Sequence, residues 1–254
     1  MSQAERIAGW MRRHLVSAGA RGFVLGLSGG IDSAVVLRLA QLAAPNATIG
    51  AILPCYSDPQ DEQDAIFVAA HFSAPTLRID LSDAYDRLIG TLQPAVQSLP
   101  KYTRPAAPPG LPGDRLPLAN IKPRLRMTTV YFIANSLNYL VAGTTNRSEL
   151  AIGAFTKHGD GGADLLPLGR LAKGEVRGLA RELGVPPAIV SRPASAGLWI
   201  GQTDEEEMGF SYEELERYLD EGPQGVSPAL AMKIERLTRS TDHKRELPPM
   251  PDVE

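Results

Sequence analysis

A serine- and glycine-rich turn between an apolar strand and an apolar helix restricts the fold more than any other feature of this chain. The run GFVLGL at residues 22–27 has the length of a buried strand, and IDSAVVLRLAQLAA at 31–44 is typical of a helix. Two more strands are predicted at 48–54 and 76–80, each followed by a helix. Such alternation predicts an α/β protein with a doubly wound parallel sheet, covered by helices on both faces.

The rest of the chain continues this pattern, and we expect a single domain over residues 1–254. A helix is predicted at 120–138, a strand at 139–144 and a helix at 172–185, followed by a C-terminal helical tail over about 204–254. Residues 99–118 contain six prolines, which suit neither a helix nor a central strand. This loop is either a surface connection or a lid that orders when substrate binds.

Composition excludes several classes of protein. The chain has 26 Lys and Arg against 29 Asp and Glu, a net charge of −3, which does not favour a nucleic-acid binder. The single cysteine, Cys55, excludes an intramolecular disulfide and a cysteine-rich zinc site, and it fits a reducing compartment. No signal peptide or membrane-spanning run is visible, so we expect a cytoplasmic protein with no membrane partner.

The turn itself has the chemistry of a phosphate site. Gly29 and Gly30 lack a Cβ atom, so a phosphate can approach the backbone closely, and the amides at the start of the helix can donate to it. The hydroxyls of Ser28 and Ser33 add further donors. The carboxylate of Asp32 would repel a phosphate unless a cation lay between them, which suggests Mg²⁺.

The sequence SGGIDS resembles the pyrophosphate loop of ATP pyrophosphatases, which cleave ATP between its α and β phosphates. Further segments, in the same order along the chain, resemble motifs of ammonia-dependent NAD⁺ synthetases. These segments are NIKPRLRM at 120–127, VAGTTNRSE at 141–149, FTKHGDGGADLLP at 155–167, AGLWIGQTDE at 196–205 and HKR at 243–245. The resemblance runs from about residue 20 to the end of the chain.

The resemblance implies an adenine nucleotide α-hydrolase-like, Rossmann-like fold and a defined reaction. ATP and Mg²⁺ would adenylate the nicotinate carboxylate of deamido-NAD⁺ and release pyrophosphate. Ammonia would then displace AMP to give NAD⁺. Glutamine-using relatives carry a further hydrolase domain with a catalytic cysteine, so free ammonia is the expected nitrogen donor. The family also implies a homodimer with substrate sites at the subunit boundary.

The resemblance further implies a role for individual residues. Asp32 and Glu149 would ligate Mg²⁺, and Asp32, Lys173 and Asp160 would take part in catalysis. Deamido-NAD⁺ would contact Arg124, Lys157, Asp164, His243 and Lys244. ATP would contact Gly26, Leu27, Ser28, Gly29, Gly30, Ile31, Asp32, Ser33, Thr144, Lys173 and Ser195.

Several of these residues also have a simpler interpretation. Lys173 could be a solvated helix lysine, His243 and Lys244 a solvated tail, and Asp160 a turn-forming aspartate. Cys55 is better explained as a small apolar filler than as a nucleophile.

The chain departs from the family pattern at three site positions. His158 stands where the family has Tyr, Pro123 where it has a small residue, and Ser195 where it has Thr.

Two other functions compete with the synthetase. A second pyrophosphatase activity, such as transfer-RNA thiolation, would call for more reactive cysteines and a basic surface. A catalytically inactive nucleotide-binding module would be expected to lack Asp32 or Glu149, and both are present.

Overall fold

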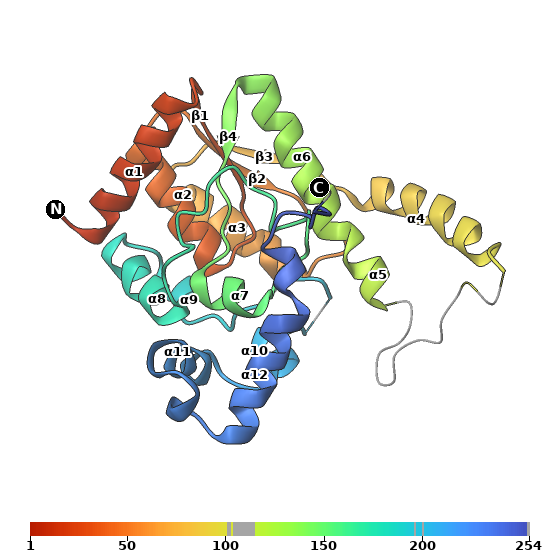
Figure 1. The fold of residues 1–254 in the computed structure, drawn as a ribbon. Helices are drawn as coiled ribbons and strands as arrows, with labels where there is room; N and C mark the ends of the chain where they lie inside the picture. Colours follow the sequence, from red (N-terminus) through yellow and green to blue (C-terminus); the bar gives the residue numbers. More distant parts are fainter. Residues whose placement is uncertain (101–102, 104–114, 196, 200, 253–254) are drawn as a thin grey trace.

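The computed structural model describes residues 1–252 except 101–102, 104–114, 196 and 200. Its core is a four-stranded sheet in the order β3-β2-β1-β4, and every neighbouring pair is parallel (Figure 1). The strands are β1 (Gly22–Gly26), β2 (Thr48–Ile52), β3 (Thr76–Arg78) and β4 (Tyr139–Val141). All four were predicted, and the parallel α/β sheet is confirmed.

Helices connect the strands and extend the chain beyond them. The helices that belong to the strand–helix alternation are α1 (Gln3–Ser17), α2 (Ile31–Ala43), α3 (Pro59–His71), α4 (Ser82–Gln97), α5 (Arg115–Ala119) and α6 (Ile121–Leu137). Those that follow the sheet are α7 (Arg147–Ile152), α8 (Lys173–Glu182), α9 (Pro187–Val190), α10 (Asp204–Met208), α11 (Tyr212–Glu221) and α12 (Pro228–Ser240). The 3₁₀ turns η2 (Pro223–Gly225) and η3 (Asp242–Lys244) lie before and after α12.

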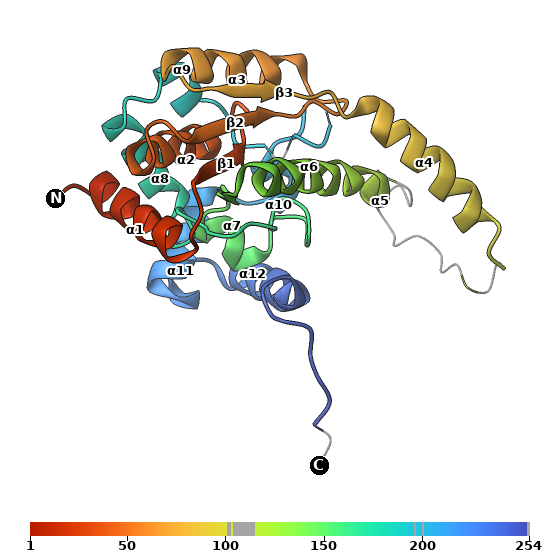
Figure 2. The same ribbon diagram turned by 90° about the horizontal axis from the view of Figure 1, so that it is seen from above.

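Strand β1 shows why both faces of the sheet are covered. Phe23 and Leu25 lie in one apolar cluster with residues of α1, α2, α3, α8 and α9, whereas Val24 lies in another with Val130 and Ile133 of α6. Successive strand residues point to opposite faces, so a wholly apolar strand requires a layer of helices on each side. Figure 2 shows these two layers, with α6 on the opposite side of the sheet from α2 and α8.

The C-terminal helices have an apolar cluster of their own. Ile152 of α7 packs there with Leu215 of α11 and Ile234 of α12. The segment after residue 203 contains α10 to α12 and η3, whereas residues 245–252 form no helix.

Two details differ from the prediction. Most of the proline-rich loop at 99–118 lies outside the described residues, and its last part, from Arg115, belongs to the short helix α5. Pro123, a residue that would kink the middle of a helix, lies in the first turn of α6, where its missing N–H would have no partner within the helix. Among the described helices, none combines the length and the apolar character needed to cross a membrane.

Candidate functional site

The phosphate turn has the conformation that its two glycines allow. Gly29 has a φ of 82°, which side-chain-bearing residues rarely adopt, and a Cβ atom there would lie 2.4 Å from the carbonyl oxygen of Asp61 in α3. Gly29 is therefore required by the packing of α3 as well as by access to a ligand. The sequence predicted the need for access to a ligand, but not the close packing of α3 against Gly29.

The amides of the turn point to an anion site at the start of α2. Gly30 is the N-cap residue of α2, its backbone is extended, and no side chain caps the helix there. The serine side chains instead brace the turn: Ser33 Oγ donates to Gly30 O at 2.9 Å and lies 3.1 Å from Ser28 Oγ. The first turn of α2 thus has amides without a side-chain cap beside a hydrogen-bonded turn, an arrangement that suits a phosphate group.

Three charged side chains meet beside this turn. Lys173 Nζ, at the start of α8, lies 2.5 Å from Asp32 Oδ2 and 3.4 Å from Glu149 Oε1. The side chain of Lys173 is 3% exposed, and each carboxylate side chain is 16% exposed. The interpretation of Lys173 as a solvated helix lysine is therefore wrong. We call Asp32, Glu149 and Lys173 the carboxylate–lysine cluster.

The electrostatics of the cluster follow from its burial. Burial, together with the nearby negative charge of Asp32, raises the pKa of Glu149 to about 8. Burial alone would lower the pKa of Lys173, but the carboxylates of Asp32 and Glu149 outweigh it and raise that pKa. Lys173 is thus charged at neutral pH, and two carboxyl groups share its one positive charge.

The cluster is held in place by local structure at the ends of β1 and β4. Asn146 caps α7, where its side chain accepts from Glu149 N at 3.0 Å and its own amide donates to Glu149 Oε2 at 3.1 Å. Asn146 Nδ2 also donates to Asp32 Oδ1 at 3.1 Å. The backbone amide of Lys173 donates to Ser148 Oγ at 3.2 Å, which ties α8 to α7. One capping box therefore orients both carboxylates.

Four of the residues predicted to bind deamido-NAD⁺ lie near one another. Lys157 Nζ donates to the carbonyl oxygen of His243, and Arg124 Nη2 donates to the carbonyl oxygen of Lys157 at 3.3 Å. Lys244 Nζ donates to the carbonyl oxygens of Gly153 and Phe155, at 2.6 and 2.7 Å. Lys244 is therefore not part of a solvated tail. We call Arg124, Lys157, His243 and Lys244 the basic cluster.

The remaining predicted residues have other surroundings. Asp164 accepts from Val141 N at 2.7 Å and from the hydroxyl of Tyr131 at 3.1 Å. Asp160 Oδ1 accepts from Thr156 N at 2.9 Å, a contact typical of a turn-forming aspartate. Ser195 Oγ accepts from Gly197 N at 3.1 Å. Thr144 follows β4 and is half-buried. The predicted roles of these four stay predictions.

Cys55 lies in the loop that follows β2 and is fully buried. Burial raises the pKa of its thiol, and the nearest cations, Arg126 and Lys122, only partly oppose this. A buried thiol with a raised pKa is a poor nucleophile, which supports the interpretation of Cys55 as an apolar filler.

Sequence reasoning missed three charged residues that hold the loops around the turn. Arg192 forms ion pairs with Asp61 and Asp64 of α3, the latter at 2.6 Å. Lys122 Nζ donates to Leu198 O at 2.8 Å, and Arg126 Nη2 donates to Ser57 Oγ at 2.9 Å. Lys122 and Arg126 stand in the quoted segment NIKPRLRM, so that motif was the available signal.

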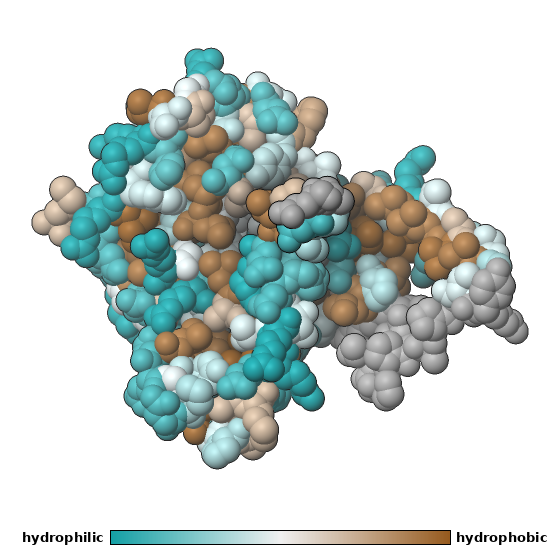
Figure 3. Space-filling model, in the orientation of Figure 1, coloured by the Kyte–Doolittle hydropathy of each residue, from teal (hydrophilic) through white to brown (hydrophobic). Residues whose placement is uncertain are grey.

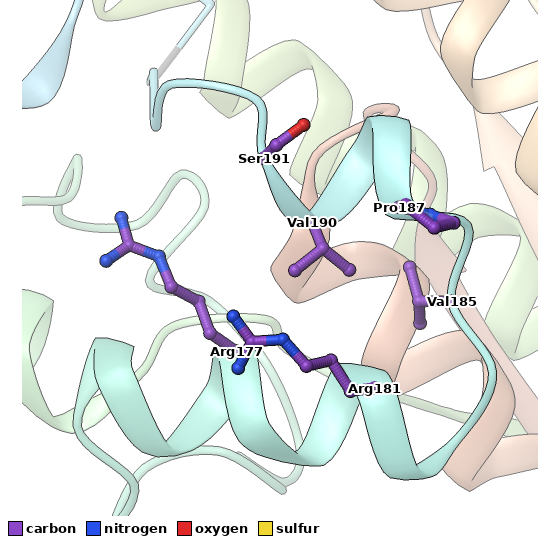
Figure 4. A pocket seen from close by; sticks show the side chains of 6 residues that line it. All are labelled: Arg177, Arg181, Val185, Pro187, Val190 and Ser191. Carbon is purple, nitrogen blue, oxygen red and sulfur yellow. The ribbon is translucent and has the colours of Figure 1, made fainter.

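One surface pocket lies apart from all of the predicted site residues. It is lined by Arg177 and Arg181 of α8 and by Val185, Pro187, Val190 and Ser191. Figure 4 shows the side chains of Arg177 and Arg181 along one side of the pocket and Val190 on the opposite side. The ATP and dinucleotide residues predicted from the sequence therefore do not form this pocket.

Comparisons with known proteins agree with the geometry. The family model described as NAD synthase matches residues 3–248. An NH₃-dependent NAD⁺ synthetase of Carboxydothermus hydrogenoformans is 46% identical, over 98% of this chain and 96% of that protein.

Solved structures agree as well. An NMN synthetase from Francisella tularensis has a TM-score of 0.87 at 35% identity, over 99% of this chain and 98% of that one. An NAD⁺ synthetase from Burkholderia pseudomallei has a TM-score of 0.74 at 36% identity, over 97% and 90%. A phosphate turn, a buried carboxylate–lysine cluster and a full-length match in sequence and fold lead to one conclusion: this chain belongs to the NAD synthase family.

Proposed function

We propose that this chain is an ammonia-dependent NAD⁺ synthetase. In the first step a carboxylate oxygen of deamido-NAD⁺ attacks the α-phosphorus of ATP, and pyrophosphate leaves with the electron pair of the broken P–O bond. In the second step ammonia attacks the carboxyl carbon, the C–O bond to AMP breaks, and the amide loses a proton. The observation that carries this proposal is the carboxylate–lysine cluster beside a phosphate turn, in a chain of this family.

ATP is expected to place its phosphates on the turn at 26–33. The uncapped amides at the start of α2 would donate to them, with the hydroxyls of Ser28 and Ser33 nearby. Lys173 would offset the negative charge that grows on the pyrophosphate as it leaves, and because it is buried it does so in surroundings that screen charge weakly. Thr144 and Ser195 are the further predicted contacts.

Asp32 and Glu149 fit a site for Mg²⁺. Both contact the same ammonium group, so their oxygens are close together, and one or two carboxylates with substrate phosphates form the usual surroundings of this ion. A divalent cation would also offset the burial and the nearby charge of Asp32, which together raise the pKa of Glu149. When bound, Mg²⁺ supplies charge neutralisation for the phosphates. Asp32 and Glu149 would hold it, and Asn146 would keep both carboxylates oriented.

The basic cluster suits the dianionic, ribose-rich substrate. Neither Arg124, Lys157 nor Lys244 forms an ion pair with a carboxylate in the described part of the chain. Their charges are held by backbone carbonyl oxygens instead, so an anionic substrate would not have to displace a carboxylate. We therefore assign deamido-NAD⁺ to this cluster, with Asp164 as the further predicted contact.

The high similarity to an NMN synthetase favours a second candidate substrate. The amide product NMN requires the acid form, nicotinate mononucleotide, and the same two steps would convert it. The Francisella tularensis structure matches with a TM-score of 0.87, against 0.74 for the Burkholderia pseudomallei NAD⁺ synthetase. The two substrates differ by the adenylate half, which the basic cluster would bind.

One experiment separates the two substrates. The chain is incubated with ATP, Mg²⁺, ammonium and either deamido-NAD⁺ or nicotinate mononucleotide, and kcat/KM is compared by product analysis. Our proposal predicts the higher kcat/KM for deamido-NAD⁺, and a preference for the mononucleotide would contradict it. Glutamine in place of ammonium should give no product, so synthesis from glutamine in a preparation free of glutaminase would contradict the assigned nitrogen donor.

We also propose that two copies of the chain associate through α4 and α6. No residue of α4 is buried, and the helix projects from the body of the molecule (Figure 2). Apolar residues on this side are exposed, namely Leu92 at 40%, Val96 at 55% and Phe132 at 72%, and Figure 3 shows apolar surface over α4. Such a surface is typical of a protein interface.

Sedimentation should give the mass of a dimer for the chain and of a monomer for Val96→Asp/Phe132→Asp. A monomeric parent chain would contradict the proposal.

A further inference from the structure

The ammonium group of Lys173 faces an aromatic ring that sequence reasoning did not single out. Lys173 Nζ lies 5.1 Å from the centroid of the Tyr212 ring, at the start of α11. Tyr212 is 1% exposed, and its ring belongs to the C-terminal apolar cluster. The C-terminal helices therefore form one wall of the carboxylate–lysine cluster.

Hydrogen bonds hold both the ring and the backbone of Tyr212. Its hydroxyl donates to Asp204 Oδ2 at 2.7 Å, and its backbone amide donates to Glu205 Oε1 at 3.0 Å. Burial, with the nearby carboxylates of Glu149 and Asp204, raises the pKa of the Tyr212 phenol, so the hydroxyl keeps its proton and can donate. The ring thus has one hydrogen-bonded orientation.

Helix α11 is also attached to the elements that carry the ATP residues. Gly174 N, next to Lys173, donates to Glu216 Oε1 of α11 at 2.8 Å. Asp204 N donates to Ala194 O at 2.9 Å, immediately before Ser195. Asp204 therefore links the tyrosine to the segment that holds a predicted ATP contact.

We propose that Tyr212 is a positioning residue for the adenylation step: its ring holds the Lys173 ammonium group toward Asp32 and Glu149, and its bond to Asp204 holds the ring. A lysine side chain has many rotamers, and an aromatic face within about 6 Å of the ammonium favours the ones that point toward the ring. Because Tyr212 is buried, it would act through Lys173 rather than on ATP or the reacting carboxylate. The inference rests on the proposed function because it assumes that Lys173 acts on ATP.

Values of kcat for three variants separate a positioning role of Tyr212 from a purely structural one. Tyr212→Leu keeps an apolar side chain in the cluster but removes the ring, whereas Tyr212→Phe keeps the ring and removes the bond to Asp204. If the ring positions Lys173, the leucine variant should lower kcat by roughly tenfold, in the range of cation–π contributions. The phenylalanine variant should stay within about threefold of the parent chain. Tyr218→Leu, on the same helix and in the same apolar cluster, is the matched control and should change kcat by less than about twofold.

The decisive test is a double-mutant cycle between Tyr212 and Lys173. Isothermal titration measures the affinity for ATP with Mg²⁺ in the parent chain, Tyr212→Leu, Lys173→Met and the double variant, each checked for folding by circular dichroism. We expect Tyr212→Leu to weaken binding by roughly fivefold in the parent chain and by less than about twofold in the Lys173→Met background, because its effect passes through the ammonium.

Two results would overturn the inference. One is an equal loss of affinity in both backgrounds, and the other is a loss of kcat in Tyr212→Phe as large as in Tyr212→Leu. Failure of the proposed function is distinguishable from these, because it would appear as absence of amide product from the parent chain, whereas the titration needs only ATP and Mg²⁺.

Discussion

The carboxylate–lysine cluster and the basic cluster are both charged, but they are built in opposite ways. In the first, Lys173 is buried and lies within 3.4 Å of both carboxylates, on the first turns of α2, α7 and α8. In the second, Lys157 and Lys244 donate to backbone carbonyl oxygens, in the loop after α7 and in η3. The first cluster pairs its cation with carboxylates of the same chain, and the second keeps positive charge available for a ligand.

This difference suggests a division of labour. Charges held at the ends of strands and helices are fixed accurately, as an adenylating centre requires. Loops and chain ends adapt more easily to a large substrate. Damage to the first cluster should therefore lower turnover, and damage to the second should weaken binding of the dinucleotide.

The largest effect is expected from Asp32→Asn. The substitution keeps the shape of the side chain but removes a charge that faces Lys173 and, by our proposal, Mg²⁺. We expect kcat to fall by about 10²- to 10³-fold, the loss typical when one group that stabilises transition-state charge is removed. Circular dichroism should show an unchanged fold. Asp220→Asn, an exposed carboxylate that pairs with Arg147, is the control, and near-parental turnover with unchanged Mg²⁺ dependence in Asp32→Asn would refute the metal role.

A smaller and more selective effect is expected at the C-terminus. His243→Ala/Lys244→Gln should raise KM for deamido-NAD⁺ by roughly tenfold, about the cost of one charge-assisted hydrogen bond, and should leave KM for ATP within about twofold. Truncation after Ser240 should act in the same direction. The truncation is harder to interpret, because it also removes Thr241, whose hydroxyl donates to Ile152 O at 3.0 Å. Arg239→Gln, at the exposed end of α12, is the matched control, and equal changes in both KM values would count against this assignment.

The smallest effect concerns stability and its dependence on pH. The pKa of Glu149 is 4.5 in its ordinary state and is raised to about 8 in the folded chain. Between these two pH values, the folded chain binds the proton more tightly than the unfolded chain. This contribution to stability is present at low pH and is lost as the pH rises toward 8.

Glu149→Gln removes that titration, and its amide oxygen can still accept from Asn146 N. Without ligand, we therefore expect the Tm of the variant minus that of the parent chain to increase from pH 5 to pH 8.5. Differential scanning calorimetry measures it, with Glu235→Gln as the control. A difference that stays constant or decreases with pH would show that Glu149 is not the destabilising group.

Much of this architecture could be predicted from local sequence. Alternation of apolar strands and amphipathic helices predicted the parallel sheet, and the turn at Ser28-Gly29-Gly30 marked the site because only certain residues suit it. Lys173 could be named from the family resemblance, but its burial could not be predicted, since that depends on α7 and α11 meeting around it. Tyr212 and Arg192 escaped notice because side chains that they face lie far away in the sequence: Lys173 for Tyr212, and Asp61 and Asp64 for Arg192.

The central claim is that the carboxylate–lysine cluster serves transfer of AMP to a carboxylate, and isotope transfer tests it most directly. Deamido-NAD⁺ labelled with ¹⁸O in the nicotinate carboxylate is incubated with the chain, ATP, Mg²⁺ and ammonium, and the products are analysed by mass spectrometry. Our account predicts one ¹⁸O atom in AMP for each NAD⁺ formed and none in pyrophosphate, because the carboxylate oxygen that attacks the α-phosphorus leaves with AMP. Label in inorganic phosphate together with ADP, or unlabelled AMP beside amide product, would contradict it.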